Sequence, residues 1–144
     1  MLETVPCPLL SPKASAPLKA LTANKEEAMA ITRHGVGQIM SQIVEHGDTV
    51  YLQGFTADDK NADIKGQTQQ VLARIDAALA AAGTDKSRVL SAQIFVSDIG
   101  LRPLLNEVWK TWIDPRNPPT RACVGVQLEG NTKVEIIIVA AKKP

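Results

Sequence analysis

The chain has 144 residues, a formal net charge of +1 and an aromatic content of 3%. This length suits one domain that is large enough to bury a hydrophobic core. Charges of both signs are interspersed and few rings are present for stacking on bases, so the composition argues against nucleic-acid binding. No apolar stretch reaches the roughly 20 residues that a membrane helix needs, and small solutes are therefore the favoured partners.

The two cysteines, Cys7 and Cys123, are far apart, and neither has a CxxC partner or a histidine at ligand spacing. The sequence therefore indicates neither a zinc site nor a disulfide framework. It also lacks the GxGxxG, P-loop and HExxH motifs, so we expect no metal and no cofactor. Unpaired cysteines favour a cytoplasmic protein.

Residues 1–30 differ from the rest of the chain, with four prolines and a short helix-like run over residues 24–30. They show neither a secretory signal nor the arginine-rich pattern of a transit peptide. We interpret them as an N-terminal extension, either genuine or preceding an internal start at Met29, and assign them no chemistry. The folded domain is expected over residues 31–144.

The first half of this domain predicts three strands and a long helix. Residues 31–34, 42–45 and 49–53 have the composition of strands, and His46-Gly47-Asp48 forms the turn of a hairpin. After a polar loop over residues 56–61, one apolar stripe at three-and-four spacing predicts a helix over residues 63–82. Gly83 is a natural end for that helix.

The second half predicts a strand, a shorter helix and two final strands. Alternating apolar residues mark a strand over 89–96, and a helix begins near Pro103, a residue favoured in a first helical turn. Residues 121–128 and 133–141 form the last two strands around a turn that contains Gly130-Asn131. The order βββαβαββ predicts an α+β domain with a mixed or antiparallel sheet and two helices on one face.

The last two strands are expected to pair as a hairpin and to turn their more apolar faces toward the helices. Those faces consist of Ala122, Val124, Val126 and Leu128 on one strand, and of Val134, Ile136, Ile138 and Ala140 on the other. The opposite face then carries Arg121, Cys123, Gly125, Gln127, Glu135, Ile137 and Val139. Because this second face is half apolar, we expect a closed, cyclic oligomer to cover it.

Arg121 is the first candidate for chemistry. It follows Asn117-Pro118-Pro119-Thr120, and consecutive prolines give a stiff, extended approach that fixes where its side chain points. A guanidinium suits bidentate capture of a carboxylate, so a small carboxylic acid is the ligand that this pattern indicates. The alternative is a surface salt bridge.

Glu135 is the second candidate, because a carboxylate is out of place among branched aliphatic residues. It either orients or deprotonates water as a general base, or pairs with an arginine across an interface. In the expected hairpin it lies six residue pairs from Arg121, a distance on the order of 20 Å. If both serve one site, that site must lie between subunits.

Asn106 and Cys123 are weaker candidates. Asn106 either places an amide near the ligand or occupies an ordinary exposed helix position. Cys123 shares the predicted face of Arg121, but no neighbouring histidine activates it, and a packing role is the alternative.

Several short segments lie along residues 36–141 in a characteristic order and spacing. They are Ser41-Gln42, Gly47-Asp48-Thr49-Val50-Tyr51-Leu52 with Gly54, Gln67-Thr68, Val71-Leu72, Ala81-Ala82-Gly83, Asn106-Glu107-Val108, Pro118-Pro119-Thr120-Arg121-Ala122-Cys123 and Val134-Glu135-Ile136. Each segment alone is a weak signal, but the combination is specific. Together they resemble the RidA/YjgF family.

The resemblance implies a homotrimer of chorismate mutase-like fold with three sites at its subunit interfaces. It also implies the hydrolysis of 2-aminoacrylate and related imino acids to 2-oxo acids and ammonia, without a cofactor. Arg121 would hold the substrate carboxylate and Glu135 would help to position water, while Cys123, Gly54 and Asn106 would line the pocket. An iminium carbon is already electrophilic, so orientation and one polarised water suffice for this reaction.

Three positions depart from the family pattern. Met40 stands where a pocket tyrosine is usual, and Gln53 and Phe55 replace the serine and the glutamine on either side of Gly54. A pocket lined by these residues is expected to favour a larger or less polar substrate. Two alternative functions are a non-catalytic trimer that binds 2-oxo acids or regulates a partner, and a catabolic deaminase of an aminomuconate-like enamine.

Overall fold

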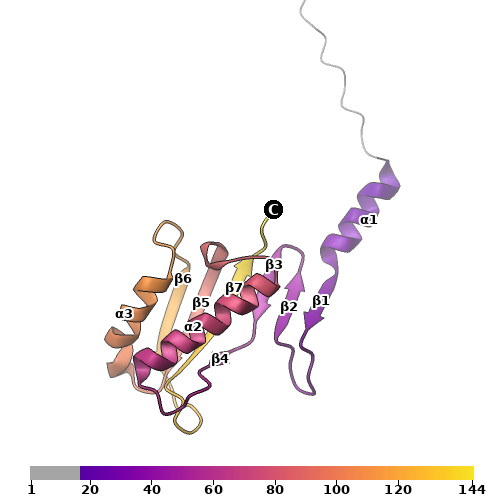
Figure 1. Cartoon of the computed structure of the whole chain (residues 1–144). Helices are drawn as coiled ribbons and strands as arrows, with labels where there is room; N and C mark the ends of the chain where they lie inside the picture. The colour runs from indigo at the N-terminus through magenta and orange to yellow at the C-terminus, as the bar shows by residue number, and fades with distance from the viewer. Residues whose placement is uncertain (1–16) are drawn as a thin grey trace, which may run out of the picture.

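The computed structural model describes residues 17–144 of the chain (Figure 1). Its elements, in chain order, are α1 (Leu18–Met29), β1 (Ile31–His34), β2 (Ile43–His46), β3 (Thr49–Leu52), β4 (Phe55–Thr56), α2 (Ile64–Ala81), the 3-10 helix η1 (Lys86–Arg88), β5 (Val89–Val96), the 3-10 helix η2 (Ile99–Leu101), α3 (Arg102–Trp112), β6 (Thr120–Gly125) and β7 (Val134–Ala141). The predicted strand over 89–96 is confirmed, and so are the two predicted helices of the domain, with boundaries within one residue of those expected.

The strands form one mixed sheet in the order β1-β2-β3-β7-β5-β6, and the short strand β4 also pairs with β7. All pairs are antiparallel except that of β5 with β6. The predicted hairpin of the last two strands is therefore wrong, because β5 lies between them. Helix α3 connects β5 to β6 as a crossover, which makes these two strands parallel neighbours, and residues 126–133 then lead the chain past β5 to β7.

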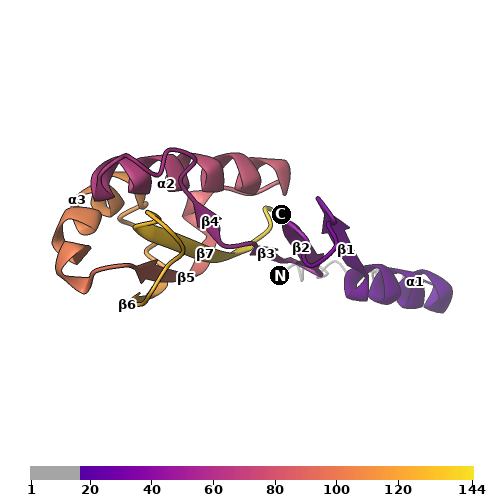
Figure 2. The ribbon, with the colours of Figure 1, turned by 90° about the horizontal axis from the view of Figure 1, so that it is seen from below.

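Helices α2 and α3 lie together on one face of the sheet, as predicted (Figure 2). The Asp63 carboxylate caps α2 by accepting a hydrogen bond from the Gly66 N–H at 2.8 Å. Pro103 occupies the first turn of α3. The indole N–H of Trp112 donates to Asp76 Oδ1 at 2.9 Å, which ties α3 to α2 and fixes the helix whose residues form the site.

The core lies between these helices and the two central strands. The buried side chains that face the helices are Val134, Ile136, Ile138 and Ala140 of β7, and Ala92, Ile94 and Val96 of β5. The predicted core face of β7 is thereby confirmed. On β5, Leu90 is exposed instead of buried, because a bulge between Val89 and Ser91 interrupts the alternation of the strand.

The two faces of β6 are the reverse of the prediction. Its parallel register places Arg121 beside Ala92 and Cys123 beside Ile94, and both β5 residues face the helices. Paired residues on neighbouring strands share a face, so Arg121 and Cys123 also lie on the helix side, while Val124 is exposed on the other. Apolar alternation misassigned this strand because β6 is at the edge of the sheet, where α3 leaves room above it for polar side chains.

Candidate functional site

Arg121 is held by two neighbours on α3. Its Nη2 donates to Oδ1 of Asn106 at 2.6 Å, and its guanidinium carbon lies 5.1 Å from the centre of the Trp109 ring. The hydrogen bond and the cation–π contact fix the direction of an otherwise flexible side chain. No carboxylate of residues 17–144 lies within salt-bridge distance of this guanidinium, so the alternative of a salt bridge within the chain is not observed.

A cavity of about 320 Å³ opens beside this guanidinium and is lined by Arg102, Asn106, Arg121 and Cys123. The Cys123 thiol is free and half-buried, and it packs against the edge of the core. Three predicted site residues are therefore brought together. The lining contains two arginines and no acid, a balance of charge that attracts an anion.

The loop before β6 fixes the position of the site arginine. The Asp114 carboxylate accepts hydrogen bonds from the Arg116 N–H at 3.0 Å and from the Asn117 side-chain amide at 2.9 Å. Both bonds lower the pKa of Asp114, and the bond from Asn117 has the larger effect. After the two prolines, Thr120 Oγ1 donates to the Leu90 carbonyl at 3.1 Å. The register in which β6 meets β5 is thus set immediately before the arginine.

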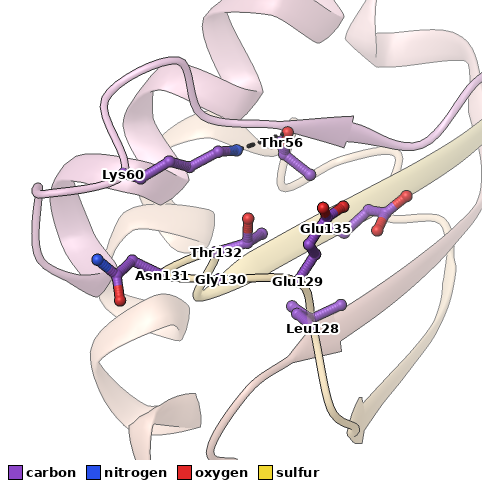
Figure 3. Close-up of a pocket in the computed structure, with 8 residues that line it drawn as sticks. All are labelled: Thr56, Lys60, Leu128, Glu129, Gly130, Asn131, Thr132 and Glu135. Atoms are coloured by element: carbon purple, nitrogen blue, oxygen red, sulfur yellow. Dashed lines mark hydrogen bonds between the residues drawn. The ribbon is translucent and has the colours of Figure 1, made fainter.

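Glu135 lies at a different cavity, of about 510 Å³ (Figure 3). The residues that line this cavity are Thr56, Lys60, Leu128, Glu129, Gly130, Asn131, Thr132 and Glu135. Strand pairing places Glu135 beside Thr56 of β4 and Phe95 of β5. The Lys60 ammonium donates to Thr56 Oγ1 at 2.9 Å, so this cavity combines carboxylates with one fixed cation.

Gly54 lies directly against the carboxyl group of Glu135. A Cβ added at Gly54 would be 3.0 Å from the Glu135 carboxyl carbon and closer still to one of its oxygens, so a larger residue would displace the carboxylate. The preceding residue, Gln53, is half-buried, and its N–H donates to the Gln42 carbonyl at 2.9 Å. Two predicted site residues from distant segments, Gly54 and Glu135, are therefore neighbours.

The buried side chain of Gln67 connects α2 to two loops beside this second cavity, one before α2 and one before β7. Its amide nitrogen donates toward the carbonyls of Lys60, Ala62 and Asn131 at 3.1–3.2 Å. Its amide oxygen accepts from the Lys133 N–H at 2.9 Å. Sequence patterns indicated no such role, because Asn131 and Lys133 are more than sixty residues away along the chain.

Arg121 and Glu135 lie on opposite faces of the sheet within one protomer. Arg121 faces α3, whereas Glu135 alternates with the buried residues of β7 and so points to the other face. On β5, Arg121 pairs with Ala92 and Glu135 pairs with Phe95. The backbones of Arg121 and Glu135 are therefore three residues apart along the strands and two strands apart across the sheet, a distance of about 14 Å. The predicted offset of six pairs and about 20 Å is wrong, because β5 separates the strands.

Met40 and Phe55 do not line the Arg121 cavity of the single protomer. Met40 is 47% exposed in the loop between β1 and β2 and does not line the Arg121 cavity. Phe55 is only 7% exposed in the core, with the Arg74 guanidinium carbon 5.4 Å from its ring centre. Its ring packs in the core, because its pairing with Ile136 turns it toward the helices.

Arg102, which lines the Arg121 cavity, and Trp109, which contacts Arg121, were not among the predicted site residues. Trp109 was expected only on the buried side of its helix, and its ring also supports the guanidinium of Arg121. Arg102 precedes Asn106 by four residues, a spacing that puts both on one helix face. The signal for Arg102 was therefore present in the sequence once Asn106 was placed at the site.

The part of the chain that the structure describes contains no cluster of three or more His, Cys, Asp or Glu residues placed to hold a metal ion. None of its helices combines the length and the apolar character needed to cross a bilayer. Cys7 lies outside the described residues, so the structure bears only on Cys123.

These features define a small α+β protein that has an anion-attracting cavity on one face of its sheet and a carboxylate-lined cavity at the other. The sequence model of the Endoribonuclease L-PSP family matches residues 36–142. A RutC family protein of Haemophilus ducreyi is 38% identical over 112 residues, which are 77% of this chain and 96% of the relative. The chain therefore belongs to this family, which is the RidA/YjgF family.

Two further relatives extend the comparison. The crystal structure of NMB1025 from Neisseria meningitidis, described as a member of the YjgF protein family, superposes with a TM-score of 0.78 at 35% identity. That match covers 81% of this chain and 98% of NMB1025. A protein of Dermatophagoides farinae named 2-iminobutanoate/2-iminopropanoate deaminase is 34% identical over 104 residues, or 67% of this chain and 80% of the relative.

Proposed function

We propose that this protein hydrolyses reactive imines and enamines of small carboxylic acids, of the 2-aminoacrylate type, to 2-oxo acids and ammonia. The observation that carries the proposal is the Arg121 guanidinium, which is held by Asn106 and Trp109 beside a cavity and lacks a carboxylate partner in residues 17–144. The deaminase name of the relative from Dermatophagoides farinae supports the same reaction.

In this proposal Arg121 binds the substrate carboxylate through paired hydrogen bonds and thereby fixes the adjacent C=N carbon. An enamine first gains a proton at carbon and becomes the iminium. A water held by Glu135 adds to the iminium carbon and gives up a proton to that carboxylate. Transfer of this proton to nitrogen lets the C–N bond break, and the hydroxyl proton passes to the departing ammonia as the C=O bond forms. Water and the iminium thus yield a 2-oxo acid and ammonium.

Because Arg121 and Glu135 lie on opposite faces of one sheet, the proposed site requires two copies of the chain. We propose a homotrimer with one such site at each interface. Support comes from the face of the sheet that α2 and α3 leave uncovered, which exposes Tyr51 and Val124 to 46% each and carries the half-buried Ile137 and Val139. An apolar face of this kind is stabilised by burial against another copy.

Ammonia release from 2-aminoacrylate generated in situ tests the proposed reaction. Arg121→Ala should lower kcat/KM by about 100-fold, because the substrate loses the contact that orients it. Lys110→Ala removes an exposed cation from the same helix, outside the cavity, and should retain wild-type turnover.

Equal turnover by the wild type and Arg121→Ala would refute the proposal. Calorimetric binding of 2-oxobutyrate without any turnover would indicate a regulatory ligand-binding protein instead. Turnover confined to an aminomuconate-like enamine in a substrate panel would assign the protein to a catabolic step. Sedimentation of the wild type as a species of one chain mass would exclude a shared site.

A further inference from the structure

The cavity beside Arg121 contains a second arginine that the reaction described above does not use. Arg102 lies in the first turn of α3 and lines the cavity together with Asn106, Arg121 and Cys123. No carboxylate of residues 17–144 lies within salt-bridge distance of Arg102. Two unpaired guanidinium groups therefore line one small cavity.

The two arginines differ in how firmly they are held. Arg121 is fixed by its hydrogen bond to Asn106 and by the Trp109 ring. Arg102 makes no side-chain hydrogen bond, ion pair or ring contact with residues 17–144. Its backbone lies one helical turn before Asn106, about 6 Å along the axis of α3. A fixed guanidinium and an adaptable one thus lie side by side, and the adaptable one can follow a ligand of variable length.

This arrangement is unfavourable without a ligand. Two like charges at one cavity repel each other, and the lining contains no acid to offset them. A cation in the first turn also opposes the helix dipole, and that turn of α3 contains no acidic residue. Both effects are relieved by a ligand that carries two negative charges.

We infer that the cavity binds substrates with two acid groups, namely the imines of dicarboxylic 2-oxo acids. This inference rests on the proposed function, in which Arg121 binds the carboxylate next to the C=N carbon. Arg102 then binds the distal carboxylate and selects substrates that have one. The volume of about 320 Å³ is at the lower end for ligand sites, which suits a short dicarboxylate. The preferred substrate is more polar than the sequence predicted.

Calorimetric titration of the whole protein with 2-oxoglutarate and with 2-oxobutyrate tests this inference. The wild type should bind 2-oxoglutarate at least about 10-fold more tightly, which corresponds to about 1.4 kcal/mol. Arg102→Gln should abolish that preference by weakening 2-oxoglutarate alone, and Arg102→Lys should restore part of it. Lys110→Gln makes a similar change of charge outside the cavity on the same helix and should leave both affinities unchanged.

Several results would overturn the inference. They are an absent preference for 2-oxoglutarate in the wild type, an equal loss of both ligands in Arg102→Gln, and displacement of 2-oxoglutarate by equimolar inorganic phosphate, which would indicate a general anion site. Turnover of 2-aminoacrylate together with any of these results would remove the dicarboxylate preference and leave the proposed function intact. A preference for 2-oxoglutarate that depends on Arg102, without turnover of any imine, would keep the dicarboxylate preference and remove the proposed function.

Discussion

A guanidinium on a flexible stem binds a small anion weakly unless its direction is fixed in advance. In this protein the direction of Arg121 is fixed from one side by Asn106 and from below by Trp109. Both neighbours lie on α3, three residues apart, so one helix supplies the whole support. A residue that sequence alone presents as an isolated arginine is in fact part of a prearranged group.

Gly54 provides the residue-scale prediction, because its missing side chain leaves room for the Glu135 carboxylate. Gly54→Ala should lower kcat/KM for imine hydrolysis by about 100-fold, since displacement of a catalytic group by about 1 Å has an effect of this size. The measurement is steady-state ammonia release, with thermal unfolding recorded in parallel.

The matched control is Gly37→Ala, which adds the same methyl group where only the Met40 carbonyl oxygen is near, at 3.5 Å. This control should keep both turnover and melting temperature. Full activity in Gly54→Ala would mean that the position of the Glu135 carboxylate does not matter for the reaction.

At the scale of elements, α2 is the framework on which the Glu135 cavity is built. Its residue Gln67 is completely buried and bonds to two loops that are distant from each other in sequence. A buried polar group of this kind stabilises only when its hydrogen bonds are complete, and no buried side-chain nitrogen or oxygen of residues 17–144 lacks a partner. The loops at the cavity therefore depend on one amide.

Gln67→Leu should lower the free energy of unfolding by about 2–4 kcal/mol, because it removes the hydrogen-bond partner of the Lys133 N–H and of three part-buried carbonyl groups. Denaturant unfolding measures this loss. Gln69→Leu makes the same change at an exposed position of α2 and should alter the stability by less than about 0.5 kcal/mol. Equal effects of the two variants would disprove the structural role of Gln67.

At the scale of the whole molecule, the two cavities belong to different faces of the sheet. Neither cavity contains both Arg121, which would bind the substrate carboxylate, and Glu135, which would act as the base. Subunit association would supply the missing half of each site. Activity would then depend on protein concentration near the dissociation constant of the oligomer.

Mixing two inactive variants tests this dependence. Arg121→Ala and Glu135→Gln are each expected to be inactive, but subunits unfolded together and refolded in equal amounts should recover about one quarter of wild-type activity. Chance assembly joins an intact Arg121 to an intact Glu135 of a neighbouring subunit at about that fraction of interfaces. Ammonia release measures the recovery, and the same mixture kept without subunit exchange is the control. No recovery after verified exchange would show that Arg121 of one subunit and Glu135 of another do not share a site.

The sequence by itself determined the long amphipathic helix α2, the strand β5, the α+β class and the two charged residues that are unusual for their surroundings. These features follow from local patterns, since periodicity reports which residues of one segment share a face. Only the tertiary structure decided that β6 pairs with β5 in parallel, which face Arg121 occupies, and that Gly54 touches Glu135. Such features depend on contacts between distant segments, and alternation along one edge strand cannot indicate which side of the sheet its helix will cover.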